Sequence, residues 1–269
     1  MPAERVLLSF ARMKTKMRWK SSAIPAAVLL AAAAMLAGPA TAGPPFRTDD
    51  PEPVDYQHWE VYAFSTGTEV HGDAAGILPG IEVNYGAAPG VQLHIIMPLA
   101  YDSADGGTRF GYGDTELGVK IRLVDEDKDG WRPMIGVFPL IELSSGNARR
   151  GLGAGYTREF LPLWIQKSFG DWTSYGGGGY NINPGPGNKN YWFAGWYLQR
   201  QVTDQLALGG EIFHQTADRI GGGDSTGFNL GGIFDFTEHH HLLFSAGRGL
   251  QNARDSNQLS YYLGYQLTF

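Results

Sequence analysis

The sequence contains no cysteine, so a disulfide framework, thiol chemistry and a cysteine-linked lipid anchor are all excluded. After residue 42, no run approaches the roughly 18 apolar residues that a membrane-spanning helix needs. Basic residues are also scarce there, since 15 Lys and Arg stand against 26 Asp and Glu, a net charge of −11. This acidic balance argues against nucleic acid as a partner, because surfaces that bind nucleic acid are basic.

The first 42 residues have the layout of a secretory signal peptide. Basic residues are concentrated between positions 12 and 20, and the apolar run Ala23–Ala37 follows. The small-x-small sequence Ala40–Ala42 then precedes Gly43, as at a cleavage site. The alternative is an N-terminal membrane anchor, but the apolar run is shorter than the ~20 residues of a span. We therefore expect an exported protein that is cleaved near Ala42.

This division gives a signal peptide over residues 1–42 and one domain over residues 43–269. The chain can start at Met1 or at Met17, because the basic stretch begins late. The Pro-rich residues 43–55 lack a strand pattern, and we expect them to form a short periplasmic lead-in. No linker or change in composition divides the rest.

Alternation along the mature part indicates the fold class. Glycine and aromatic residues are abundant, with 38 Gly and 13% aromatics, as in an all-β chain dense in turns. Over 114–123, charged side chains alternate with apolar ones, and side chains in a strand point to opposite faces with period two. Twelve such strands are predicted, at about 56–66, 80–86, 91–101, 112–123, 133–143, 159–169, 172–182, 191–202, 205–216, 225–236, 240–249 and 258–269.

The links between these strands alternate in length. Short links are expected after every even strand, whereas longer Gly- and Asp-rich links follow the odd ones, at 67–79, 102–111, 144–158, 183–190, 217–224 and 250–257. Membrane barrels have short periplasmic turns and longer external loops. Twelve strands would then leave both termini in the periplasm. The pattern predicts a transmembrane antiparallel up-and-down β-barrel in the outer membrane of a Gram-negative-type bacterium.

The last strand gives the strongest support for a membrane barrel. Six large apolar side chains fall on one of its faces, and the chain ends on an aromatic residue: Leu259, Tyr261, Leu263, Tyr265, Leu267 and Phe269. A strand that closes a barrel presents such a face to lipid and places an aromatic residue in the interface girdle. We expect outer-membrane lipid and the outer-membrane assembly machinery to contact it. The alternative is an edge strand of a secreted β-sandwich.

Several segments resemble a known family: Pro44–Phe46, Leu78–Gly86, Val91–His94 and Gly113–Leu123. They are similar to the outer-membrane transporter family named after the meta-pathway of phenol degradation. The segment Gly113–Leu123 is the most specific, although Ile121 stands where an aromatic is usual. The resemblance implies an outer-membrane channel or uptake protein, with hydrophobic or aromatic compounds among its solutes. It supplies no functional residues.

Charged residues on the inward faces are the candidates for lining the lumen: Glu82, Asp114, Glu116, Lys120, Arg122, Glu211 and Arg248. Rings of charged side chains select which solutes pass a pore. In a narrow barrel the same charges form a satisfied internal network, and the two roles are compatible. Tyr191, Phe193 and Tyr197 share one face of their strand, so they either offer an apolar path inside or belong to an aromatic belt.

Metal and cofactor sites are not expected. His239 and His241 share a face at a tight turn, but no third ligand accompanies them. The sequence Asp125–Gly130 copies the start of a calcium loop, yet Gly136 stands where that loop needs a bidentate Glu. Both segments are predicted to be solvated turns.

Three functions remain open. The favoured one is a passive outer-membrane channel or transporter for small solutes. A lipid-modifying barrel enzyme is the second, since His214 and Ser225 lie on neighbouring predicted strands, but no motif of a lipase surrounds them and we do not expect an enzyme. The third is a structural barrel with a plugged lumen.

Overall fold

The computed structural model describes residues 44–104 and 106–269, so the predicted signal peptide and both possible start sites lie outside the described residues. Fourteen β-segments form one antiparallel sheet. They are β1 (Trp59–Val70), β2 (Asp73–Ala88), β3 (Val91–Ala104), β4 (Gly107–Tyr112), β5 (Thr115–Val124), β6 (Met134–Val137), β7 (Leu140–Leu143), β8 (Arg158–Phe169), β9 (Trp172–Ile182), β10 (Tyr191–Thr203), β11 (Leu206–Gln215), β12 (Ser225–Asp235), β13 (His240–Gln251) and β14 (Leu259–Thr268).

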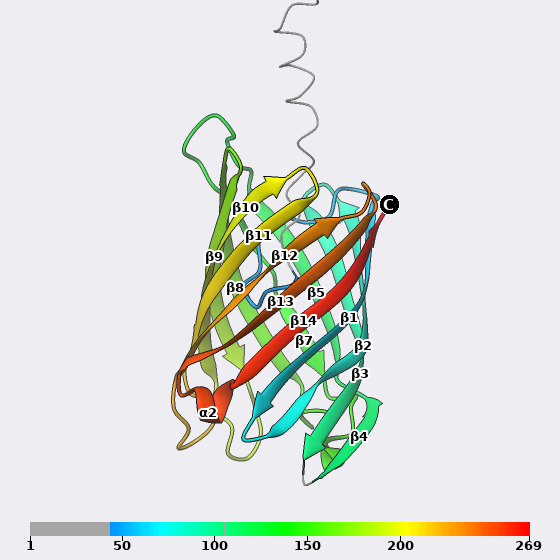
Figure 1. Cartoon of the computed structure of the whole chain (residues 1–269), viewed down its shortest axis with the longest axis vertical. Coiled ribbons are helices and arrows are strands. Elements are labelled where there is room, and N and C mark those ends of the chain that lie inside the picture. Colours follow the sequence, from blue (N-terminus) through cyan, green and yellow to red (C-terminus); the bar gives the residue numbers. More distant parts are fainter. Residues whose placement is uncertain (1–43, 105) are drawn as a thin grey trace, which may run out of the picture. The chain divides into compact units, whose positions relative to one another are not determined.

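The sheet closes on itself into a barrel (Figure 1). Each strand pairs with its neighbours in the sequence, and β14 returns to pair with β1 from Glu60↔Thr268 to Glu69↔Leu259. Backbone hydrogen bonds between Trp59 and Phe269, at 2.8 and 3.1 Å, complete this seam. Pairing of β14 with β1 joins the first and last strands of the wall, as a lipid environment requires.

Fourteen segments make twelve barrel strands, because two strands are interrupted. β4 and β5 both pair with β3, and the break between them falls at Gly113 and Asp114. β6 and β7 both lie between β5 and β8, and their break includes Pro139, which has no N–H to donate to the ladder. The predicted twelve-stranded antiparallel barrel is therefore confirmed.

Two predicted long links are strands instead. β1 runs to Val70 and β2 starts at Asp73, so residues 67–79 form a hairpin with the two-residue turn His71-Gly72. Both turn residues have positive φ, 57° and 86°, which matches the twist of a tight hairpin. β3 and β4 likewise fill most of 102–111. The sequence did not indicate these strand extensions, because many of their residues are small or polar and show no apolar alternation.

The two ends of the barrel differ as expected. One end carries the start of β1 and the end of β14, together with short turns such as that between β8 and β9; we call it the terminal end. The other, the loop end, carries the longer links, including a short 3-10 helix, η1 (Ala148–Arg150), and the helix α2 (Ala253–Ser256). In outer-membrane barrels the short turns face the periplasm.

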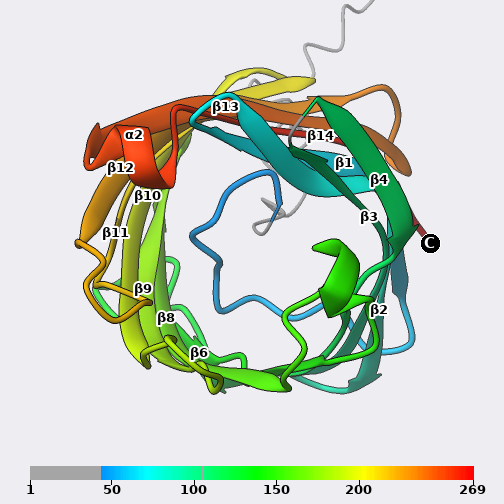
Figure 2. The ribbon, with the colours of Figure 1, turned by 90° about the horizontal axis from the view of Figure 1, so that it is seen from below.

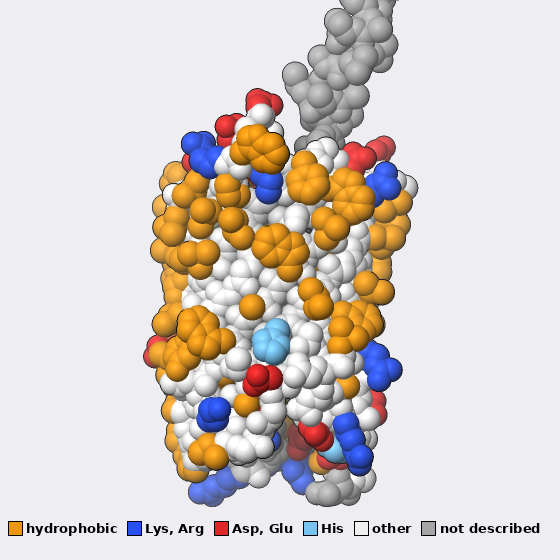
Figure 3. Space-filling view, turned by 90° about the vertical axis from the view of Figure 1, so that its left-hand side faces the viewer, with side chains coloured by type: hydrophobic (Ala, Val, Ile, Leu, Met, Phe, Trp, Pro, Cys, Tyr) orange, Lys and Arg blue, Asp and Glu red, His pale blue; other side chains and the backbone are white. Residues whose placement is uncertain are grey.

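The outer wall is apolar. Hydrophobic side chains cover much of it, and charged ones gather toward the two ends (Figure 3). On β10 the outward Trp192, Trp196 and Leu198 are exposed, whereas the inward Phe193 and Tyr197 are buried. Such an apolar band is suited to contact with lipid. In a membrane, lipid would cover the surface that is exposed in the isolated chain. No helix within 44–104 and 106–269 is long and apolar enough to cross a membrane.

The closing strand has the faces that the sequence indicates. Its outward side chains are exposed or half-buried: Leu259, Tyr261, Leu263, Tyr265, Leu267 and Phe269. On the inner face Gln266 is 1% exposed and donates to the hydroxyl of Tyr62 at 2.8 Å. β14 is thus apolar toward the outside and polar toward the lumen.

The periplasmic location predicted for the lead-in is wrong, because residues 44–54 lie inside the barrel. Figure 2 shows this segment, in blue, looping through the interior of the ring. Thr48 and Asp50 in it have no exposed surface. We call residues 44–54 the inner segment; its polar groups are satisfied by side chains of the lumen, which the sequence pattern does not display.

Candidate functional site in the barrel lumen

Glu211 on β11 is the main anchor of the inner segment. Its carboxylate accepts hydrogen bonds from the backbone N–H of Arg47 at 2.9 Å and of Thr48 at 2.8 Å, and from the Thr48 hydroxyl at 2.6 Å. Asn229 on β12 donates a fourth, at 2.6 Å. Glu211 is 4% exposed, so these donors replace the water that a carboxylate needs.

Lys120 on β5 also binds the inner segment, through its positive charge. Its ammonium lies 3.0 Å from the carboxylate of Asp49 and 3.4 Å from that of Asp50. Burial raises the pKa of Asp50, and the charge of Lys120 opposes that shift. Without Lys120, two carboxyl groups would share a dry site with no cation between them.

Other contacts fix the ends of the inner segment. Ser245 on β13 donates to the carbonyl of Pro45 at 2.5 Å, and the N–H of Val54 donates to Gln92 on β3 at 2.9 Å. A Cβ at Gly195 would overlap the Thr48 hydroxyl, so glycine permits this close approach. The segment is therefore bound by β3, β5, β10, β11 and β13, across the whole interior.

A second polar network crosses the wall from β2 to β5. Asn84 donates to Glu82 at 2.8 Å, and its carbonyl oxygen lies 2.7 Å from His94 Nδ1. His94 Nε2 lies 3.1 Å from Glu116, and the ring meets Phe138 edge-on. Glu82, Asn84 and His94 are all buried. The arrangement joins four inward side chains by direct contacts.

Apolar side chains fill much of the remaining interior in two clusters. One contains Tyr62, Phe64, Ile233 and Leu243, and the other contains Phe138, Trp164, Phe193 and Phe213. Tyr191, Phe193 and Tyr197 all lie on the inner face of β10, and Tyr197 has no exposed surface. The lumen thus combines aromatic walls with a few charged groups, and it is not a plain water channel.

The predicted lumen residues are placed as follows. Glu82, Glu116, Lys120 and Glu211 face the interior and enter the networks above. Arg122 shares the face of Lys120 and pairs with Asp125 at 2.8 Å near the terminal end.

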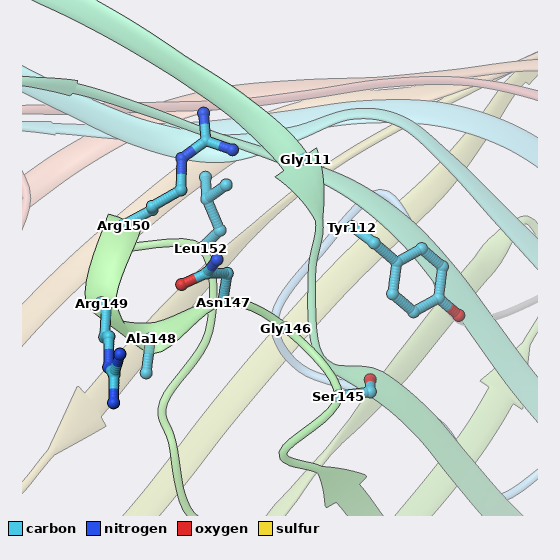
Figure 4. Close-up of a pocket in the computed structure, with 9 residues that line it drawn as sticks. All are labelled: Gly111, Tyr112, Ser145, Gly146, Asn147, Ala148, Arg149, Arg150 and Leu152. Carbon is cyan, nitrogen blue, oxygen red and sulfur yellow. The ribbon is translucent and has the colours of Figure 1, made fainter.

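Asp114 lies at the loop end and does not take part in the networks above. Its two carboxylate oxygens accept the N–H groups of Gly146 at 2.8 Å and of Ala154 at 2.6 Å. This holds the link 144–157 inward, so that η1 lies over the mouth of the ring (Figure 2). A cleft of about 600 Å³ opens between this link and β4 (Figure 4). Arg149 and Arg150 border it.

The inward position predicted for Arg248 is wrong. Arg248 is exposed and lies opposite Phe228, which is on the outer face of β12. Leu243 and Ser245 take the inner face of β13 instead, where Leu243 is 1% exposed. The middle of β13 is apolar on both faces, so alternation cannot define its register, and packing against the inner cluster decides it.

The outer-wall histidine does not form a catalytic triad. His214 Nδ1 lies 2.9 Å from the hydroxyl of Thr226, which donates to Gln251 at 2.8 Å. The hydroxyl therefore stands between the imidazole and the amide. Acyl transfer needs the third group on the imidazole, where it fixes the tautomer.

The turn residues bind protein groups. His241 Nδ1 lies 2.6 Å from Asp235, and Asp127 accepts the N–H of Gly130 at 3.1 Å. In the part of the chain that the structure describes, no group of three metal-ligating side chains comes together.

Comparisons with known proteins support the fold. No family model and no curated protein matches the sequence. An outer membrane channel from Pseudomonas putida F1 is similar in structure, with 16% identity and a TM-score of 0.64 over 82% of this chain and 98% of that one. The NanC porin has 10% identity and a TM-score of 0.55 over 78% and 98%. The chain therefore has the closed antiparallel β-barrel fold of these outer-membrane proteins.

Sequence reasoning missed the inner segment. A signal was present, however, since the acidic Asp49, Asp50 and Glu52 precede a barrel whose predicted inward face carries the basic residue Lys120. Glu52 accepts from Gln166 at 3.2 Å. Burying the acidic segment or the lysine alone would cost free energy, because each charge would lack a partner. Pairing the two inside the barrel removes that cost.

Proposed function

We propose that this protein is an outer-membrane channel for small solutes and that the inner segment closes its lumen. The observation that carries the proposal is how the segment is held. Among the described residues, no backbone–backbone hydrogen bond joins residues 44–54 to a strand. The segment can therefore leave the lumen without breaking the ladder of the barrel.

The dimensions and chemistry of the lumen fit small solutes. Twelve strands enclose an interior between that of an eight-stranded barrel, filled by side chains, and that of a sixteen-stranded porin. The two apolar clusters favour solutes with hydrophobic or aromatic parts over ions and sugars. Cleavage near Ala42 would make the inner segment the N-terminus of the mature chain, and thus free to move.

The test is ionic current through planar bilayers. A variant lacking residues 44–54 is expected to conduct continuously, whereas the complete mature chain conducts rarely. The competing function, a structural barrel with a filled lumen, predicts silence from both. Closed bilayers across ions, sugars and aromatic solutes with the shortened variant would end the channel proposal.

A disulfide gives the matched control, because the natural chain has no cysteine. An ideal Cβ at Gly195 lies 3.1 Å from that of Thr48, close to the separation of about 3.5–4.5 Å found in disulfides. The double variant Thr48→Cys with Gly195→Cys should be silent when oxidised and should conduct in reductant more often than the wild-type protein, because it lacks the Thr48 hydroxyl that binds Glu211. Equal current in both states would show that the segment does not gate the path.

We further propose that β14 is the strand recognised by the outer-membrane assembly machinery. Its apolar outer face and terminal Phe269 support this assignment. Accumulation of unfolded chain after removal of Phe269, with no change in synthesis, would be the expected result.

A further inference from the structure

The side chain of Arg47 stands apart from the rest of the inner segment. Its backbone N–H is fixed by the buried Glu211, but its side chain remains exposed although it lies within the ring of strands. An exposed side chain in such a place borders water inside the barrel. Its Nη2 donates to Gln215, the last residue of β11, so the guanidinium points toward the loop end.

The guanidinium of Arg47 lies over two aromatic rings. Its central carbon lies 4.5 Å from the ring centre of Phe213 and 5.4 Å from that of Phe193. Phe160 packs edge-on against Phe193 at 6.1 Å, which extends the apolar wall toward the loop end. The two rings beside the guanidinium are 3% and 6% exposed, so they are fixed by their own packing. The cation therefore has a rigid position.

Most of the hydrogen-bonding capacity of this cation is unused. Within the described part of the chain, no carboxylate lies within ion-pair distance of the Arg47 guanidinium, and Gln215 takes one donor at 3.2 Å. A guanidinium presents its N–H groups as a planar fork that a carboxylate accepts in pairs. Planar apolar groups in turn stack on phenyl rings.

The neighbouring acids do not compete for the same donors. Glu211 already accepts four hydrogen bonds, from the inner segment and from Asn229. Glu142 is paired with Arg158. Asp218 also acts on Arg47 by its charge, so the surroundings disfavour ligands that carry several negative charges. A single carboxylate attached to an apolar body matches both the cation and the wall.

We infer that Arg47, positioned by Phe193 and Phe213, and the half-buried Phe160 form a binding site for small aromatic carboxylates that enter from the loop end. The inference rests on the proposed channel function and names the class of solute. Arg47 holds the carboxylate, and Phe160, the partly exposed end of the phenyl wall, contacts the ring. Half of this site belongs to the inner segment, so the shortened variant lacks the anchor for the ligand even where its lumen is open.

The test measures binding by calorimetry on the purified mature protein in detergent, with benzoate, benzyl alcohol and acetate as probes. Benzoate is expected to bind more tightly than either of the others. Arg47→Gln should weaken benzoate binding roughly 10- to 100-fold, the loss expected from charge-assisted hydrogen bonds, and leave benzyl alcohol unchanged. Arg200→Gln is the matched control, because Arg200 also lies over an aromatic ring, Trp172, but on the outer wall.

Three results would overturn the inference. They are acetate binding as tight as that of benzoate, the absence of benzoate binding to the wild-type protein, and unchanged benzoate affinity in Arg47→Gln. The first two need no variant, so a folding defect cannot hide them. Benzoate binding without any current would reject the channel function but support the binding site. Current without benzoate binding would support the channel function but reject the binding site.

Discussion

The inner segment and the closing strand β14 meet the same barrel in opposite ways. β14 is held by backbone ladders to β1 and β13, and its side chains are divided between lipid and lumen. The inner segment is held by side chains of five strands, β3, β5, β8, β11 and β13, and by no ladder among the described residues. The strand therefore depends on the pattern of its side chains, whereas the segment depends on a few individual ones.

This difference explains which part can move. Ladder bonds are many and form together, so β14 leaves only when the barrel unfolds. The inner segment relies on Glu211 and Lys120, both buried and both charged. Loss of either leaves buried charges without their partners, and the cost of that state favours release of the segment.

The largest effect is expected from Lys120→Met. Removing the ammonium leaves Asp49 and Asp50 without their cation, and breaking a buried pair costs about 3–5 kcal/mol. The barrel should still fold, but the inner segment should leave the lumen and the open fraction in planar bilayers should rise sharply. Lys167→Met is the control, because that lysine pairs with Glu126 outside this network. Equal open fractions in the two variants would contradict the role of Lys120.

A smaller effect on a different quantity is expected from Leu263→Arg in β14. Leu263 is 53% exposed on the outer wall, where a charge near the bilayer midplane costs about 2–4 kcal/mol. The free energy of unfolding in lipid vesicles, measured in urea, should fall by that amount while the gate is unaffected. Leu259→Arg, at the end of the same face, should cost only about 0–1 kcal/mol. Similar losses at both positions would argue against lipid contact in the middle of the strand.

The smallest effect is expected from Thr48→Ala. The hydroxyl of Thr48 donates to Glu211 at 2.6 Å, and a hydrogen bond to a charged group contributes about 1.5–3 kcal/mol. Its backbone N–H still reaches the same carboxylate, so the segment should open more often without leaving permanently. Brief openings in single-channel records would show this. Thr66→Ala is the control, since that hydroxyl bonds within the wall to the carbonyl of Tyr261.

Much of the wall could be predicted because period-two alternation is a local property. The faces of β5 and β14 follow directly from their residues, and the strand count follows from the turns between them. The prediction failed where both faces are apolar, as in the middle of β13, and Arg248 was then assigned to the wrong side. It also failed at 67–79, where small residues continue a hairpin that composition alone describes as a loop.

The sequence by itself determined the barrel strands, the closing strand and the inward faces of clearly alternating strands such as β5, because each depends on residues adjacent in the chain. Only the tertiary structure decided what fills the lumen. Arg47 meets Glu211 across 164 positions and Lys120 meets Asp49 across 71, and no local pattern specifies such pairs. Closing the sheet brings these side chains into one dry interior, where each buried charge requires a partner.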